Sequence, residues 1–276
     1  MHRPAISLST AAVSFLGLIV LGFLALTVPS VRATDAAVLQ DFMALDRPRV
    51  HDLFDGVTDL VDPLPYALAG LVLCAVALVR GRRWSAVTVA GLLVITGATT
   101  QILKHVLVSP RFEVWLGTNQ IGDGAWPSGH ATAAMTLALC AVLVAPSRLR
   151  PTIAVLGGAF ALAVGYALIV LAWHYPSDVI GGYLVAGLWT SLALAALALV
   201  ERSPTPVPAP RSVPAPRLAY FGLGAAAIAT GAVVAATLVR DGVLETYVLE
   251  RPALIIAALA IAALAAALPT ALARAA

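Results

Sequence analysis

Three polar clusters interrupt an otherwise apolar sequence and hold the side chains that could do chemistry. They are Lys104 with Arg111, the tetrapeptide Pro127-Ser128-Gly129-His130, and His174 with Asp178. Two cations and the free amides of a helix start attract anions such as phosphate. A histidine beside a carboxylate can act as a nucleophile or a base. The set is typical of phosphoryl transfer, which needs positioning, electrostatic stabilisation, a nucleophile and an acid.

The first cluster has the spacing of one helical face. Lys104 and Arg111 are seven residues apart, which is two helical turns, although Pro110 can end such a helix. Lys104 is the only lysine among 17 basic residues. Its compact ammonium suits contact with a phosphate oxygen. An ordinary basic residue at a helix end is the alternative interpretation.

The second and third clusters each precede a long apolar stretch. In the tetrapeptide, the serine can cap a helix and the histidine follows directly. In the third, Asp178 lies four residues after His174 and can accept one ring N–H, which fixes the tautomer and frees the other nitrogen. The alternative for each is an ordinary helix cap or N-terminal charge with a histidine at the membrane boundary.

The elements that position these clusters are expected to cross a membrane. The 276 residues are 61% hydrophobic and 11% charged, with a mean hydropathy of +0.94, which is outside the range of soluble domains. Eight stretches without Asp, Glu, Lys or Arg are the expected helices, at about 20 residues per crossing. They run approximately over 11–29, 63–79, 84–103, 130–145, 151–173, 179–200, 218–239 and 252–272.

Charge counting predicts the orientation of these helices. With a cytoplasmic N-terminus, the inner segments hold ten arginines and the single acid Glu201, whereas thirteen acids fall outside. This is the positive-inside pattern, so both termini are expected in the cytoplasm and the three clusters outside.

The net charge of +3 is spread over loops, so the sequence has no basic patch of the kind that binds nucleic acids. Cys74 and Cys140 fall within apolar stretches and predict neither a disulfide nor a metal site.

Composition divides the chain into three parts. Residues 1–200 hold six apolar stretches and, at 32–62, a polar segment with seven aspartates that predicts short helices on the outer surface. Residues 201–217 contain six prolines and predict a semi-rigid cytoplasmic linker. Residues 218–276 are expected to form a two-helix hairpin that is structural or binds a partner.

On these residues the sequence resembles the type 2 phosphatidic acid phosphatase superfamily of integral membrane lipid phosphatases. The motifs of that family are Lys-x6-Arg-Pro, Pro-Ser-Gly-His and Ser-Arg-x5-His-x3-Asp, and the three clusters match them in order and spacing. The resemblance covers about the first six apolar stretches. It implies an all-α polytopic membrane bundle with a six-helix phosphatase core, to which the C-terminal two-helix hairpin is added.

The resemblance also implies a role for each residue. His174 would take the phosphoryl group as a phosphohistidine, Asp178 would orient it, and His130 would protonate the leaving oxygen. Four residues would hold the phosphate oxygens: Lys104, Arg111, Ser128 and the amide of Gly129. The protein would be a hydrolase of the plasma membrane that uses no metal or other cofactor. Its partners would be membrane lipids and a lipid phosphate or polyprenyl diphosphate substrate.

Two departures from the family pattern concern phosphate binding. Phe112 stands where the first motif has proline, and Ala167-Leu168 stands where the third has Ser-Arg. One hydrogen bond to a charged group is worth about 1.5 to 3 kcal/mol, so its loss costs roughly tenfold to a hundredfold in binding or rate. Another outer cation could replace the arginine, the substrate could carry less charge, or activity could be weak. From the sequence alone, Leu168→Arg is expected to raise activity.

Other function classes stay open beside the phosphatase. A lipid phosphotransferase would use the same residues with an acceptor other than water. A catalytically weakened lipid-binding or assembly protein would fit Leu168, with the C-terminal hairpin as its partner surface. A channel or transporter finds little support, because the apolar stretches contain almost no charge for a polar pathway.

Overall fold

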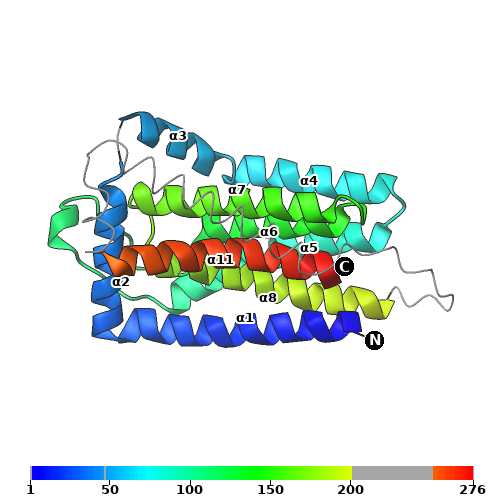
Figure 1. The fold of residues 1–276 in the computed structure, drawn as a ribbon, viewed down its shortest axis with the longest axis horizontal. Coiled ribbons are helices and arrows are strands. Elements are labelled where there is room, and N and C mark those ends of the chain that lie inside the picture. Colours follow the sequence, from blue (N-terminus) through cyan, green and yellow to red (C-terminus); the bar gives the residue numbers. More distant parts are fainter. Residues whose placement is uncertain (1, 47, 201–250, 276) are drawn as a thin grey trace.

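The computed structural model describes residues 2–46, 48–200 and 251–275, and this part of the chain is helical without strands (Figure 1). The helices of the first half are α1 (His2–Thr27), α2 (Pro29–Met43), α3 (Pro48–Asp59), α4 (Pro63–Val79) and α5 (Arg83–Val106). A short 3-10 helix, η1 (Val114–Leu116), follows. The others are α6 (Gly129–Val144), α7 (Arg150–Val170), α8 (Pro176–Val200) and α11 (Pro252–Ala275). The all-α membrane bundle expected from the sequence is confirmed.

Proline sets the start of several helices. α2, α4 and α7 each have a proline at the first or second helical position, where its fixed φ suits the helix and its missing N–H costs nothing. The turn between α4 and α5 contains Gly81 at a φ of 70°, a conformation that glycine adopts without strain. Helix boundaries therefore follow local residue chemistry.

Among the described residues, five helices are long and apolar enough to cross a membrane: α1, α5, α7, α8 and α11. α3 and α4 together are also long and apolar enough for a sixth crossing, but they meet at a bend of 53°. α6 is a shorter apolar helix of 16 residues. The expected stretch at 218–239 and the expected linker at 201–217 lie outside the described residues.

α6 lies at the centre of the bundle. Twelve of its residues are buried, and α5, α7 and α8 all pack against it. Such all-round burial explains why this helix is apolar on every side. The N-terminus of α6, which carries the second polar cluster, is thereby held between its neighbours.

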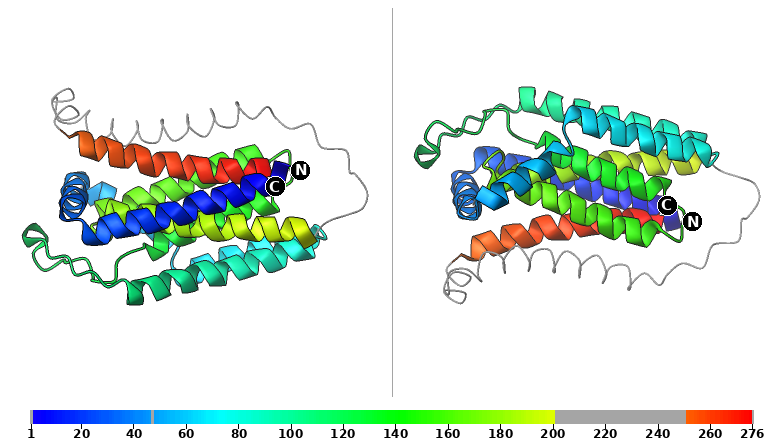
Figure 2. Two further views of the ribbon diagram at one scale, coloured as in Figure 1. Left: turned by 90° about the horizontal axis from the view of Figure 1, so that it is seen from below. Right: turned by 90° about the horizontal axis from the view of Figure 1, so that it is seen from above.

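The two ends of the bundle differ in charge. α1 begins and α11 ends at the same end, together with the basic turns that follow α4 and α6 (Figures 1 and 2). The opposite end carries α2, which runs across the bundle, and the loops before α6 and α8. All three polar clusters therefore lie at the end away from the basic turns.

The C-terminal helix α11 packs directly onto the core. It contacts α7 and α8, and the Tyr166 hydroxyl donates a 2.9 Å hydrogen bond to the Ala258 carbonyl. Gly158 of α7 lies so close to α11 that a Cβ there would be 2.5 Å from the Ala265 carbonyl oxygen. Arg251, just before α11, forms an ion pair with Asp41 of α2.

Candidate active site

The turn between α7 and α8 carries the histidine–carboxylate pair. Leu168 in the last turn of α7 accepts backbone hydrogen bonds from Trp173 (2.9 Å) and His174 (3.2 Å), so the chain folds back over the helix end. His174 Nδ1 then lies 3.2 Å from Asp178 Oδ2 in the first turn of α8. The same oxygen accepts the backbone N–H of Tyr175 at 3.0 Å.

This pair is buried and oriented. Only 7% of His174 and 1% of Asp178 is exposed. A carboxylate held by two donors fixes the imidazole with an N–H on Nδ1, which leaves Nε2 as the nitrogen with a free lone pair. The structure therefore gives His174 the arrangement that an activated nucleophile needs.

The start of α6 is joined to this turn by backbone hydrogen bonding. Ser128 donates its N–H to the Asp178 carbonyl at 2.9 Å, and its side chain caps α6 by accepting the N–H of Ala131 at 3.3 Å. Thr132 adds a 2.7 Å side-chain bond to the Ser128 carbonyl. The first-turn amides of Gly129 and His130 have no carbonyl partner within an α-helix, so this helix start can receive an anion.

A pair of glycines in α8 permits the close approach of the two helices. A Cβ on Gly181 would lie 3.0 Å from Trp126 Nε1, and one on Gly182 would lie 2.7 Å from the Ser128 carbonyl oxygen and 2.9 Å from the Thr132 nitrogen. Any side chain there would push the start of α6 away from α8. Sequence reasoning missed this pair, although Gly-Gly inside an apolar helix is a recognisable sign of close packing.

Gly182→Ala is expected to lower both stability and activity, because the added methyl meets backbone atoms of α6. Overpacking of this kind costs about 1 to 3 kcal/mol. Thermal unfolding in detergent would measure the loss. Gly97→Ala in α5 is the matched control, since nothing lies within 4 Å of its Cβ position. Equal unfolding temperatures for the two variants would contradict the tight contact.

His130 projects from the first turn of α6 and contacts a carboxylate that the sequence did not single out. Its Nε2 lies 3.2 Å from Asp62 Oδ1, just before α4, and its ring is edge-on to Trp173 with centroids 5.8 Å apart. The side chains of His130 and Asp62 are 30% and 49% exposed, so a substrate group can reach them. Asp62 is one of seven aspartates at 32–62, and nothing in the sequence distinguishes it.

Lys104 lies in the last turn of α5 and is half-buried. It is within electrostatic range of Asp178 and of His130. Within the ranges that the structure describes, its ammonium forms no ion pair, and it is therefore available to an anion.

Buried threonines hold α5 in register with α6. Thr100 bonds to Thr132 and Thr136 bonds to Thr96, each through hydroxyl groups 3.3 Å apart. Thr96 and Thr100 continue by one further turn to Lys104 on the same helical face. Hydroxyl bonds between helices in an apolar surrounding thus fix where the lysine emerges.

Arg111, in contrast, is already engaged by protein groups. Its Nη1 donates to Asp35 Oδ2 at 2.7 Å and its Nη2 to the Ala25 carbonyl at 2.6 Å. The guanidinium carbon lies 4.3 Å from the centroid of the Tyr175 ring, and Arg111 is 9% exposed. The two residues of the first motif therefore lie in different surroundings, Lys104 within electrostatic range of His130 and Arg111 against the Tyr175 ring.

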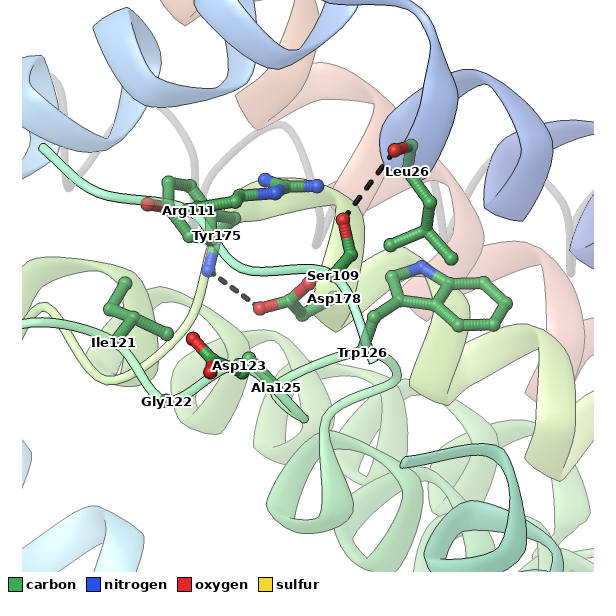
Figure 3. A pocket seen from close by; sticks show the side chains of 10 residues that line it. All are labelled: Leu26, Ser109, Arg111, Ile121, Gly122, Asp123, Ala125, Trp126, Tyr175 and Asp178. Carbon is green, nitrogen blue, oxygen red and sulfur yellow. Dashed lines mark hydrogen bonds between the residues drawn. The ribbon is translucent and has the colours of Figure 1, made fainter. Parts of the chain in front are cut away.

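A small pocket adjoins this arginine (Figure 3). The dashed line from Tyr175 to Asp178 in Figure 3 marks the bond that ties the pocket to the histidine turn. Burial raises the pKa of Tyr175 to about 12, so its ring stays neutral. The residues that line the pocket are Leu26, Ser109, Arg111, Ile121, Gly122, Asp123, Ala125, Trp126, Tyr175 and Asp178.

Leu168 is fully buried within the apolar core. The position where the family has an arginine therefore contributes packing and no charge. Five of the expected residues are brought together with Asp178, namely Lys104, Ser128, Gly129, His130 and His174. Arg111 packs against the Tyr175 ring of the same turn.

The fold is that of an integral membrane protein, and two comparisons relate it to proteins of the PAP2 type. Residues 84–201 match the model of the PAP2 superfamily. A comparison with curated proteins finds no match. The chain resembles one solved structure, described as the first transmembrane PAP2 type phosphatidylglycerolphosphate phosphatase, from Bacillus subtilis. The TM-score is 0.56 at 20% identity, covering 73% of this chain and 99% of that one.

The resemblance to the type 2 phosphatidic acid phosphatase superfamily is confirmed by this match. Residues 84–201 include all three polar clusters. The likeness to the solved structure extends the shared helical fold beyond that region. Asp35 and Asp62, which contact Arg111 and His130, both lie outside the matched residues.

Proposed function

We propose that the protein is a membrane phosphatase that removes phosphate from a lipid phosphate or a polyprenyl or lipid diphosphate. The observation that carries this proposal is the buried His174–Asp178 pair, with Nδ1 and Oδ2 3.2 Å apart, beside the N-terminus of α6. A nucleophile, an acid and a positive environment meet there. The PAP2 superfamily match supports the same activity.

In the proposed reaction, His174 Nε2 attacks the phosphorus atom and the bond to the leaving oxygen breaks. His130 gives its proton to that oxygen, and the phosphoryl group stays on His174 as a phosphohistidine. Water then attacks the phosphorus atom with His130 as the base, which releases phosphate and restores the histidine. A positioned acid of this kind typically contributes about 10² to 10⁴ in rate.

Positive groups around the site would hold the phosphate oxygens. They are the Lys104 ammonium, the Arg111 guanidinium, the Ser128 hydroxyl and the Gly129 amide. We propose that these groups stabilise the transferring phosphoryl group without a metal ion, since a helix start and preorganised cations can supply such stabilisation.

The proposed location is the plasma membrane, with the site on the extracytoplasmic face. The basic turns after α4 and α6 lie at one end and the site lies at the other, which supports cytoplasmic termini by the positive-inside pattern. A lipid phosphate of the outer leaflet would then meet the site directly.

A weakened lipid-binding or assembly protein is the second candidate. It is favoured by the buried apolar Leu168 and by the engagement of Arg111 with Asp35, because neither residue then offers an unengaged cation to a phosphate. A lipid phosphotransferase is chemically equivalent to the phosphatase up to the phosphohistidine, and only the acceptor differs.

Phosphate release by the purified protein tests these functions. Phosphatidic acid, phosphatidylglycerol phosphate and undecaprenyl diphosphate are presented in detergent with excess chelator. We expect release of inorganic phosphate from at least one of them. Transfer of label to an added acceptor lipid would identify a phosphotransferase. Binding of these lipids without release from any of them would support the second candidate and overturn the first.

A further inference from the structure

Asp35 lies outside the three motifs, yet its carboxylate accepts three hydrogen bonds near the candidate site. It is on α2, the helix that runs across the end of the bundle (Figure 1). Its Oδ1 accepts the backbone N–H of Ser177 at 3.0 Å. Its Oδ2 accepts the Ser177 hydroxyl at 2.6 Å and Arg111 Nη1 at 2.7 Å.

These contacts join three separate parts of the chain. Ser177 is in the first turn of α8, directly before Asp178, and Arg111 is in the loop after α5. Asp35 is only 8% exposed. Burial and the nearby charge of Asp178 raise the pKa of Asp35, and hydrogen bonds from Ser177 and Arg111 oppose that rise.

The guanidinium of Arg111 is consequently fixed on three sides. Asp35 and the Ala25 carbonyl each hold one terminal nitrogen, and the Tyr175 ring lies beneath the plane. An arginine has five N–H donors in a rigid fork, so donors remain for another acceptor while the side chain is held. Tyr175 follows His174 in the chain, and Arg111, Tyr175 and Asp178 line one pocket, so this fork packs against the turn that carries the proposed nucleophile.

We propose that Asp35 is a positioning residue that fixes Arg111 for contact with the phosphate of the substrate. This inference rests on the proposed function and assigns part of the phosphate site to α2. The carboxylate acts through Arg111 and touches no reacting atom. A guanidinium held in place before the substrate arrives loses little conformational freedom on binding.

Asp35→Asn separates the link to Arg111 from the link to Ser177. The amide oxygen can still accept the Ser177 N–H, and the amide nitrogen can donate to the Ser177 hydroxyl. The same nitrogen cannot accept from Arg111. We expect kcat/KM for a short-chain phosphatidic acid to fall about tenfold to a hundredfold, which is the range for one charged hydrogen bond.

Inorganic phosphate serves as the probe of binding. Its inhibition constant is expected to rise in Asp35→Asn, and its thermal stabilisation of the protein to shrink, because ligand binding to the folded state raises stability. In an Arg111→Gln background, Asp35→Asn is expected to change neither value further, since both variants remove the same contact. Asp52→Asn, at an exposed position on α3, is the control and should behave as wild type.

Three outcomes would overturn the inference. They are an unchanged Asp35→Asn enzyme, tighter phosphate binding in that variant, and losses that add in the double variant. If Asp35→Asn does not fold, Arg111→Lys takes its place, because a lysine keeps the charge but cannot span Asp35 and the Ala25 carbonyl. A wild-type inhibition constant in Arg111→Lys would equally refute it. A wild type that releases no phosphate at all would refute the proposed function, whereas the thermal shift by phosphate still tests the role of Asp35.

Discussion

Phosphate release by His174→Ala is expected to fall at least about 1,000-fold, because the substitution removes the nucleophile that would carry the phosphoryl group. The mutation leaves Asp178 with its hydrogen bond from the Tyr175 N–H, so the turn keeps one of its two ties. The loss should appear in kcat, with lipid binding largely retained. Steady-state release with the best substrate of the panel measures it.

His51→Ala is the matched control for this experiment. His51 also lies near an aspartate, with its Nδ1 3.1 Å from Asp46, but it is exposed on α3 and belongs to none of the three clusters. Its release rate should match wild type. If His174→Ala kept most of the wild-type rate, a phosphohistidine at this position would be excluded and another nucleophile would be required.

Leu168→Arg is expected to destabilise the protein strongly. From the sequence alone, this change restores a family arginine and favours higher activity. In the structure, the leucine is fully buried in the apolar core. Removing a buried leucine costs about 2 to 5 kcal/mol, and an uncompensated buried charge adds several more. The structural expectation is therefore a large fall in unfolding temperature or in the yield of folded protein.

Leu168→Met separates the loss of shape from the gain of charge, because volume-conserving swaps usually cost less than about 1.5 kcal/mol. Thermal unfolding of both variants in the same detergent shows how much of the destabilisation comes from the buried charge. A Leu168→Arg protein that unfolds at the wild-type temperature and releases phosphate faster would show that the guanidinium reaches the site. The structural expectation would then be wrong.

Much of the site could be predicted from local sequence, because its residues lie next to the helix ends that they define. His174 and Asp178 are one helical turn apart, so their contact follows from the start of α8. Ser128 is expected at a helix N-terminus, and it caps α6 as that position requires. The length of the apolar stretches likewise predicted the helical membrane fold.

Contacts between distant segments could not be predicted in this way. Asp35 and Asp62 meet Arg111 and His130 across 76 and 68 residues, and only the folded packing of α2 and α4 selects them among seven aspartates. The engagement of Arg111 also escaped the sequence, because a motif spacing says nothing about competing acceptors. The burial of Leu168 depends on the neighbours of α7 in the same way.

The shortness of α6 has a consequence for the surrounding lipid. Its 16 residues span about 24 Å at 1.5 Å per residue, whereas the hydrocarbon core of a bilayer is about 30 Å thick. With the end of α6 level with the headgroups of the opposite side, its start lies below the headgroups on its own side. Local thinning of the membrane around that point would lower neighbouring lipid phosphates toward Ser128. The protein would then draw its substrate down by bending the bilayer, and the lipid tail would never have to leave the hydrocarbon.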